Sequence, residues 1–430
     1  MRIAVVGGGW AGLAAAVDAT DHGHAVNLFE MAAQLGGRAR RVNSDGLALD
    51  NGQHILIGAY TQTLRLMRIV GLEPEHLLLR TPLRIAYPDG QGLTLPAGPA
   101  MLAFTRGVMA HKAWSWREKL SLLATATRWA RTSFRCDPSL SVSQLCATLP
   151  SAVRAELIDP LCVAALNTPV DNASASVFLS VLHDALFTGA GSADLLLPKT
   201  DLSALWPDSA ARWLAQSGAR CHLSQRVGLL ERDGGAWRVD EEPFDAVVLA
   251  ASAVEAARLA RPIAPAWSAS AEALRYEPIV TVTLRSNGTQ LAHPMLALRY
   301  SDTAPAQFVF DQGQLRGMAG LLTFVISGAR AWVDRGLDAT VEATLAQAQQ
   351  ALVAQLRGPL QRVYALVEKR ATFLCTPGLI RPPSQIAAGL FAAGDYVAGP
   401  YPATLEGAVR SGAYAAEVSG AQTAPPAARR

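Results

Sequence analysis

The chain has 430 residues, of which 50% are hydrophobic and 17% charged, and its formal net charge is +3. This length exceeds what one hydrophobic core usually supports, so we expect two domains. The low net charge excludes an extended polyanion-binding surface, and we expect no nucleic-acid partner. Five scattered cysteines without a Cys-x-x-Cys pair indicate a reduced, cytoplasmic protein with no metal site.

The N-terminal segment is not expected to direct secretion. Three consecutive glycines, residues 7–9, interrupt the first apolar stretch, so we do not expect a signal peptide. No apolar run reaches the roughly 20 residues that span a bilayer. Residues 421–430 are rich in proline and alanine and are expected to form a flexible tail.

The first 30 residues have the pattern of a βαβ unit. A β-branched strand at 3–6 leads through a glycine turn into an alanine-rich helix, and a second strand follows at 25–30. Helix amides near Trp10 and Ala11 would face phosphates, and Glu30 is placed to accept hydrogen bonds from an adenosine ribose. Glycines fill the three positions of the dinucleotide fingerprint: Gly7, Gly9 and Gly12. The alternative is a glycine-rich turn beside a surface glutamate.

The segment after Glu30 bears on whether the dinucleotide is NAD or FAD. Gly36 and Gly37 precede Arg38, which suits further pyrophosphate or flavin contacts. Together with the fingerprint, this run resembles the superfamily of flavin-containing amine oxidases and phytoene desaturases. The resemblance implies a glutathione-reductase-like α/β fold that binds FAD in an extended form.

The C-terminal region supplies a second part of this resemblance. Residues 390–412 contain an apolar strand that ends at Gly394 and Asp395, a loop, and a helix that starts near Thr404 and Leu405. In the superfamily the aspartate binds the ribitol chain, and the first helix amides approach the flavin pyrimidine. The helix N-terminus would stabilise negative charge on a reduced flavin. The loop at 396–403 has no cysteine, so we expect the FAD to be non-covalent.

A third segment lies between these two. Apolar runs flank an Asp233-Gly234-Gly235 turn, and a strand follows at 246–250. The resemblance implies that Val227 contacts the adenine through its backbone. An ordinary hairpin that serves only the sheet remains an equal interpretation.

The stretch DNGQHILIGAY at 50–60 combines polar residues with an apolar run. In the superfamily this position lies along the isoalloxazine, which would place Gly52, Gln53 and His54 beside the flavin. His54 could instead only satisfy a backbone carbonyl. The whole phrase resembles the hydroxysqualene dehydroxylase branch of bacterial squalene and hopanoid synthesis. Three further stretches resemble the same branch: 160–186, 193–208 and 307–317.

The expected architecture is an FAD-binding Rossmann domain with an inserted α+β substrate domain. The FAD domain would comprise 1–75, 215–260 and 385–420, and the substrate domain 76–214 and 261–384. The substrate domain is expected to contain strands at 279–285, 307–311 and 321–327, a helix at 337–357 and a helical region at 151–187.

Residues 104–134 interleave three tryptophans with several basic residues. That mixture is typical of an interfacial helix and makes this stretch the best candidate for a contact with the inner face of the membrane. The alternative is a solvated helix whose tryptophans face the core. The tryptophans concerned are Trp114, Trp116 and Trp129.

The resemblance implies that hydroxysqualene loses its allylic hydroxyl and gains a hydride to give squalene, a long apolar isoprenoid. Candidate proton donors are His54, Asp184 with its neighbour His183, and Asp311. A carotenoid-type desaturase or another flavin oxidase of an apolar isoprenoid is the alternative. An amine oxidase, a prenylated-protein carrier and an NAD dehydrogenase are less favoured, and the sequence does not identify the electron donor.

Overall fold

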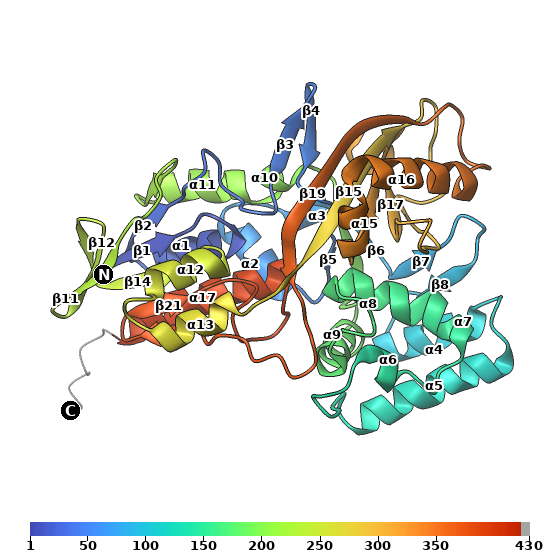
Figure 1. Ribbon diagram of the computed structural model, residues 1–430, viewed down its shortest axis with the longest axis horizontal. Helices are drawn as coiled ribbons and strands as arrows, with labels where there is room; N and C mark the ends of the chain where they lie inside the picture. The colour runs from blue at the N-terminus through green and yellow to red at the C-terminus, as the bar shows by residue number, and fades with distance from the viewer. Residues whose placement is uncertain (423–430) are drawn as a thin grey trace.

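The computed structural model describes residues 1–422. Figure 1 shows a parallel sheet and its helices on one side of the molecule and a helical layer on the other. The two long strands β15 (Tyr276–Arg285) and β19 (Gln361–Phe373) lie between them. No helix within residues 1–422 combines the length and the hydrophobicity that a bilayer span requires.

A six-stranded sheet forms the first layer, with strand order β10-β2-β1-β14-β21-β20. All neighbours pair in parallel except the edge strand β20. Its central strands are runs rich in β-branched residues that are buried except for Arg2 at the start of β1, as expected when helices cover both faces. The strands are β1 (Arg2–Val6), β2 (Ala25–Phe29), β10 (Arg220–His222), β14 (Ala246–Leu249), β20 (Gln385–Ala387) and β21 (Leu390–Ala392). The predicted βαβ unit and the strand at 246–250 are thereby confirmed.

Helices α1 (Trp10–Asp21) and α17 (Leu405–Gln422) pack closely against each other on this sheet. A Cβ at Gly412 would lie 2.1 Å from the Ala11 carbonyl oxygen, so the crossing requires a glycine. Because α17 continues to Gln422, the predicted tail from 421 is wrong for its first two residues. The rest of that prediction, 423–430, lies outside the described residues.

Helices α10 (Leu202–Leu205) and α11 (Pro207–Gln216) also belong to the packing around α1. Trp206 is 1% exposed, and its ring centroid lies 5.1 Å from that of Trp10. The sequence placed these helices in the substrate domain, with a boundary at 214. We propose instead that the boundary lies near residue 201. The other limits of the two discontinuous domains stay a prediction.

The second sheet is antiparallel, with strand order β16-β17-β18-β15-β19. One face of this sheet packs on α16 (Leu337–Ala351). This helix ends six residues before the predicted limit of 357. The three strands expected from sequence are present. The remaining elements of this layer are β16 (Met295–Ala297), β17 (Phe308–Asp311), α14 (Gln312–Arg316), β18 (Leu321–Ile326) and α15 (Arg330–Arg335).

The helical layer covers the other side of the antiparallel sheet and contains the predicted helical region at 151–187. A π-helical turn, η1 (Arg154–Ile158), lies inside this region, and Asn167 in a left-handed conformation ends α8. The helices are α4 (Ala100–Ala110), α5 (Trp116–Arg131), α6 (Val142–Leu145), α7 (Ser151–Val153), α8 (Asp159–Leu166) and α9 (Ala175–Phe187).

The stretch 104–134 is two helices instead of one. Ser115 caps α5 through a capping box with Glu118, so a new helix starts there. Trp114 is buried. Its ring stacks on the His111 ring with the centroids 3.9 Å apart, and its Nε1 donates to the Glu156 carboxylate at 2.9 Å. Trp129 is also buried, and Trp116 alone of the three is exposed, at 64%. Two of the three tryptophans thus face the core, as the alternative of a solvated helix predicted, and one faces outward.

Small hairpins and short helices complete the chain. The hairpin β11–β12 turns at Gly234 and Gly235, where the sequence predicted a turn. The remaining elements are β3 (Arg41–Ser44), β4 (Leu47–Asp50), β5 (Leu56–Ile57), α2 (Thr61–Ile69), α3 (Pro74–Leu77), β6 (Leu78–Thr81), β7 (Arg84–Ala86), β8 (Gly92–Thr94), β9 (Leu195–Pro198), β11 (Leu230–Asp233), β12 (Ala236–Val239), β13 (Glu242–Phe244), α12 (Ala253–Ala260) and α13 (Pro265–Glu272).

Candidate active site

The turn from β1 to α1 is built so closely that only glycines fit at two of its positions. Gly7 has φ +112°, and a Cβ there would lie 2.6 Å from the Ala250 carbonyl oxygen. A Cβ on Gly12 would lie 1.8 Å from the Gly7 oxygen. The fingerprint glycines therefore fix the tight turn and the contact between helix and strand, as the sequence predicted for a dinucleotide site.

The second glycine segment runs beside this turn. Gly36 N donates to the Gly8 oxygen at 2.9 Å, and a Cβ on Gly37 would lie 3.0 Å from the Gly9 Cα. Gly9 begins α1 without a side-chain cap, and the first turn of α1 has no acidic residue. Such a helix N-terminus favours an anion, which fits a pyrophosphate at Trp10 and Ala11.

Glu30 lies directly after β2 and is buried against the same turn. Its carboxylate accepts from Gly8 N at 2.6 Å and from Ala32 N at 2.7 Å. A carboxylate has about four lone-pair sites, so acceptors remain for a ribose hydroxyl. Gln225 N donates to the Glu30 carbonyl, which places the segment containing Val227 beside it. The Val227 carbonyl accepts from Arg258 Nη2 at 2.8 Å, so an adenine contact there would use its N–H.

The C-terminal element reaches the glycine segments through Arg38. Its Nη2 lies 2.6 Å from Asp395 Oδ1, although the two residues are 357 positions apart. Arg38 Nη1 also donates to the Ala371 carbonyl at 2.6 Å. Gly394 is required here, because a Cβ would lie 2.4 Å from the Tyr396 ring. The structure thus brings the residues predicted for the pyrophosphate and the ribitol into one place, with Arg38 paired to Asp395.

Thr404 lies at the start of α17 and organises its first turn. Its hydroxyl donates to the Tyr401 carbonyl at 2.7 Å and accepts from Gly407 N at 3.0 Å. Leu405 and Glu406 lie between Thr404 and the capped amide of Gly407. Their backbone N–H groups are the donors that a flavin carbonyl would use. The flavin contact expected for Thr404 and Leu405 stays a prediction.

The stretch 50–54 joins the two layers, which explains its polar residues. Asp50 forms an ion pair with Arg316 of α14 at 3.0 Å. Asn51 Nδ2 donates to the Arg38 carbonyl at 2.8 Å, and Gln53 Oε1 accepts from Gln312 Nε2 at 2.9 Å.

Gly52 separates these anchors and has φ +88°, and a Cβ there would lie 3.9 Å from the His54 imidazole. Its conformation favours a glycine for backbone reasons and leaves room on that side. Gly52, Gln53 and His54 therefore lie within one short turn, which is where the sequence expected the isoalloxazine to pass.

His54 does not suit the proton-donor role. Burial and the nearby positive charge of Arg38 lower its pKa to about 4. The imidazole is therefore neutral near pH 7, and the ring would serve in orientation or packing.

Asp311 is also withdrawn as a proton donor. It is 1% exposed, and its carboxylate caps α14 by accepting from Gly313 N at 2.9 Å. The second oxygen accepts from Leu291 N at 2.9 Å and from the Gln314 side chain at 2.8 Å. These four hydrogen bonds, including one from Gln314 N, occupy the carboxylate structurally.

Asp184 differs because it lines a cavity of about 360 Å³. Its Oδ1 lies 3.0 Å from His183 Nδ1, and it hydrogen-bonds Tyr401 in the loop before α17. Burial and the charge of Asp184 raise the pKa of Tyr401 to about 12. A second cavity of about 260 Å³ shares Val177, Arg381 and Pro402 with the first.

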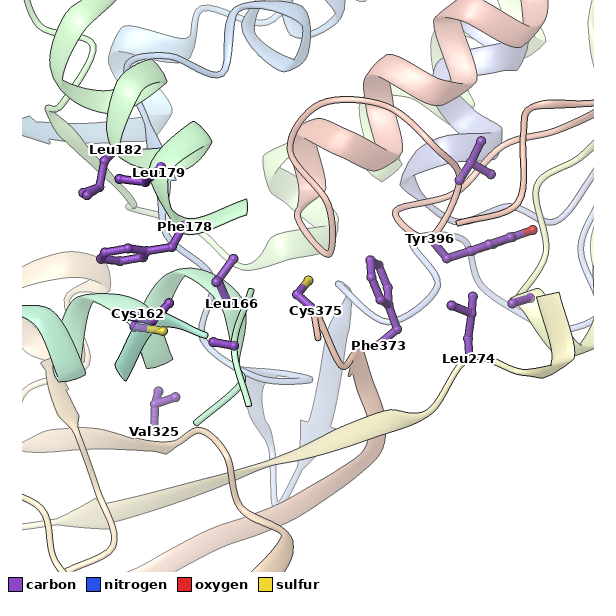
Figure 2. Packing of buried hydrophobic residues seen from close by; sticks show 14 of the residues in the cluster. Cys162, Leu166, Phe178, Leu179, Leu182, Leu274, Val325, Phe373, Cys375 and Tyr396 are labelled. Atoms are coloured by element: carbon purple, nitrogen blue, oxygen red, sulfur yellow. The ribbon is translucent and has the colours of Figure 1, made fainter. Parts of the chain in front are cut away.

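An apolar layer continues from the helices to this region. Figure 2 shows side chains from α8, α9, β18, the end of β19 and the segment after it in one buried cluster that extends to Tyr396, the residue after Asp395. Such a layer excludes water from the side of the site that faces the helices. Its labelled members include Cys162, Leu166, Phe178, Leu179, Leu182, Val325, Phe373 and Cys375.

Three buried polar atoms bordering these segments test whether a cofactor fits. The Tyr396 hydroxyl, Gln312 Oε1 and Arg40 Nε have no hydrogen-bond partner among the described residues. Tyr396 adjoins Asp395, Gln312 bonds Gln53, and Arg40 bonds the Gly37 carbonyl. Since buried polar atoms are usually satisfied, these atoms fit a polar group bound there.

The sequence did not single out Tyr396 or Gln312. Tyr396 directly follows Asp395, and Gln312 directly follows the candidate proton donor Asp311. The only sequence signal for either residue was its position next to a predicted site residue. No group of three His, Cys, Asp or Glu side chains in residues 1–422 is arranged to hold a metal ion.

Comparison with known proteins identifies the family. Residues 10–418 match the family model for flavin containing amine oxidoreductases. The chain belongs to this family. Its cofactor is accordingly FAD, and the expected FAD-binding α/β fold is confirmed.

Individual relatives differ in how much of the chain they match. Hydroxysqualene dehydroxylase from Sinorhizobium fredii is 26% identical over 98% of this chain and 99% of its own length. Zeta-carotene desaturase from a Synechocystis species is 42% identical, but over only 16% of this chain and 15% of its own. The solved structure of an oxidoreductase from Methanosarcina mazei has a TM-score of 0.74 at 15% identity and covers 97% of this chain and 100% of its own.

Proposed function

We propose that this chain is an FAD-dependent oxidoreductase that reduces hydroxysqualene to squalene. The observation that carries the proposal is the end-to-end similarity to a hydroxysqualene dehydroxylase. A desaturase would be expected to match over its substrate region as well, and the similarity to zeta-carotene desaturase extends over only 72 residues. The carotenoid alternative is therefore not favoured.

The net reaction converts hydroxysqualene, two electrons and two protons into squalene and water. Bound FAD, once reduced, supplies the two electrons and the hydrogen that replaces the hydroxyl. The residues predicted to hold it are the fingerprint glycines, Glu30, the Arg38–Asp395 pair and the first amides of α17. An external donor must supply two electrons per turnover, and its identity lies outside this proposal.

The protein's own contribution begins with exclusion of water. Loss of an allylic hydroxyl leaves a carbon centre that water would recapture, so a dry site is needed. The apolar layer of Figure 2 supports this role because its members, such as Phe178 and Phe373, are almost completely buried. A neutral His54 is compatible with a dry site, whereas a charged imidazolium would not be.

The departing hydroxyl requires a proton, and we assign its donor to Asp184, whose carboxylate must take up a proton before each turnover. Asp184 lines the cavity of about 360 Å³ with a side chain that is 26% exposed, whereas neither His54 nor Asp311 lines either of the two cavities described above. The neighbouring His183 and Tyr401 hydrogen-bond its carboxylate and would orient it. The cavity lies beside the loop that leads into α17, so the acid and the predicted flavin end share one loop.

A single-turnover assay tests the proposed function. The purified FAD-loaded protein is photoreduced without oxygen and mixed with hydroxysqualene. We expect reoxidation of the flavin absorbance with one squalene formed per flavin. Unchanged absorbance with hydroxysqualene, together with desaturation of a carotene by the oxidised protein, would reverse the assignment.

We also propose that the chain works at the cytoplasmic face of a membrane in squalene and hopanoid synthesis. The support is chemical: a thirty-carbon hydrocarbon partitions into a bilayer in preference to water. The enzyme must then collect its substrate from lipid.

A further inference from the structure

Exposed apolar side chains gather on the two outer helices of the helical layer. Five large hydrophobic residues between positions 101 and 120 are at least 38% exposed. Monomeric proteins rarely expose neighbouring apolar side chains of this size without a partner. They are Met101 (44%), Leu102 (54%), Met109 (38%), Trp116 (64%) and Leu120 (58%), and we call them the α4–α5 patch.

Contacts at the helix junction join the two halves of the α4–α5 patch. Lys119 Nζ donates to the Met109 carbonyl at 3.0 Å and lies 5.3 Å from the Trp116 ring centroid. Met109 at the end of α4 and Trp116 at the start of α5 are therefore neighbours. Leu120 follows Trp116 by one helical turn, so both lie on the same face of α5. Figure 1 shows α5 at the outer edge of the helical layer, away from the parallel sheet, with α4 next to it.

The charge around the patch is strongly positive. Residues 100–135 contain seven Lys and Arg but one acidic residue, a net charge of +6, while the whole chain carries +3, so the remainder is net −3. Glu118, the one acid, is held in the capping box of α5. Arg106, Lys112 and Arg117 are exposed next to the apolar side chains.

We propose that the α4–α5 patch docks on a lipid bilayer rich in anionic headgroups. Tryptophan, methionine and leucine would enter the headgroup boundary, and the exposed cations would contact lipid phosphates. An acidic protein partner would be attracted by the same charge. The bilayer is favoured because the apolar side chains project from two adjoining helices with the cations interspersed, a pattern typical of interfacial helices.

The position of the patch also suits delivery of an apolar ligand. Helix α5 begins at Trp116 in the patch and ends at Arg131, and Phe134 and Arg135 just beyond it line the larger cavity. One helix therefore connects the docking surface with the cavity wall. The docking proposal does not rest on the identity of the substrate, since it follows from exposure and charge.

Vesicle flotation with the full FAD-loaded chain tests this proposal without any substrate. Vesicles of phosphatidylcholine alone are compared with an equal mixture of phosphatidylcholine and phosphatidylglycerol. We expect the chain to float with the mixed vesicles at least about tenfold more than with the neutral ones. Added salt should weaken this binding, because it screens the headgroup charge.

Two matched variants identify the surface. Trp116→Asp with Leu120→Asp should reduce binding to mixed vesicles by about tenfold or more, since two acids enter the patch. The control pair, Leu229→Asp with Val353→Asp, introduces the same charge at two other exposed apolar residues and should bind like the wild type. Arg106→Gln with Arg117→Gln should weaken binding to mixed vesicles only.

Three results would overturn the proposal. One is equal flotation with neutral and anionic vesicles, and another is equal binding by the patch variant and its control. The third is a dimer in solution that Trp116→Asp with Leu120→Asp abolishes, because the patch would then join two copies of the chain. Unchanged near-ultraviolet circular dichroism and flavin content verify that each variant remains folded.

Discussion

Asp50 and Arg316 form a buried ion pair that ties the polar stretch after β4 to helix α14. Their atoms lie 3.0 Å apart, and the two side chains are only 9% and 10% exposed. Each side chain also makes one hydrogen bond to the backbone. Asp50 Oδ1 accepts from Leu202 N at 2.8 Å, and Arg316 Nη2 donates to the Ala48 carbonyl at 2.6 Å. Burial nevertheless raises the pKa of Asp50 to about 6, so desolvation outweighs the attraction of the guanidinium.

This balance predicts an asymmetry between the two partners. Asp50→Asn keeps a hydrogen-bond acceptor and removes the desolvated charge, so we expect a change in unfolding free energy within about 1 kcal/mol at pH 7. Arg316→Met leaves the carboxylate buried without its cation and should cost about 3 kcal/mol. Denaturant unfolding measures both, and Glu242→Gln in the exposed pair with Arg2 is the control. Equal losses for the two variants would contradict the asymmetry.

The pH dependence of Asp50 has a defined sign. Its folded pKa of about 6 lies above the ordinary 3.8, so the folded chain holds a proton that the unfolded chain has lost between these values. The stabilisation is complete below about pH 4 and disappears as the pH rises through 6. Relative to Asp50→Asn, the wild type should therefore become less stable over that range.

His54 should produce the opposite slope. Its folded pKa of about 4 lies below the ordinary 6.5, so its stabilisation is complete above pH 6.5 and is lost as the pH falls toward 4. His54→Gln removes this term, so the difference in unfolding free energy between wild type and variant should shrink on acidification. Denaturant unfolding at pH 7.5 and at pH 5 checks this sign. A difference that grows on acidification would mean that the imidazole is charged in the fold.

Local backbone chemistry made part of the site predictable from sequence, and distant pairing made the rest unpredictable. The close contact of Gly12 with the Gly7 carbonyl joins two residues of the same turn, so the spacing of the glycines in the chain is a sufficient signal for it, whereas Gly7 also packs against the distant Ala250. The partner of Asp50 is 266 residues away, and that of Gln53 is 259 residues away. No local pattern identifies such partners. The burial of Trp114 likewise depends on Glu156, which lies in another helix of the layer.

Tyr396 offers a test of the cofactor cradle that separates binding from folding. Its hydroxyl is buried and has no partner among residues 1–422, and burial raises its pKa above the ordinary value. Tyr396→Phe should leave the flavin-free chain equally stable or slightly more stable, because an unsatisfied polar atom is removed. The affinity for FAD should fall about fivefold to tenfold, the effect of one neutral hydrogen bond.

Thermal unfolding of the flavin-free and flavin-loaded forms, with FAD titration, measures both effects of Tyr396→Phe. Tyr87→Phe is a suitable control, since Tyr87 donates to the Glu156 carbonyl in the helical layer, away from the glycine segments. Loss of stability in the flavin-free form alone would show that the Tyr396 hydroxyl serves the fold and not the cofactor.

Asp184 and Asp311 should fail in different ways when each is replaced by asparagine. Asp184→Asn should lower the single-turnover rate of squalene formation about a hundredfold, the usual effect of losing a general acid, with an intact flavin spectrum. Asp311→Asn should chiefly reduce stability, by about 1 to 2 kcal/mol, because the side chain caps α14 and accepts from Leu291 N. Rapid-mixing absorbance measures the rate, and denaturant unfolding measures the stability. If Asp311→Asn slowed the reaction and Asp184→Asn did not, the proton would have to come from the α14 side of the site instead of the cavity beside Tyr401.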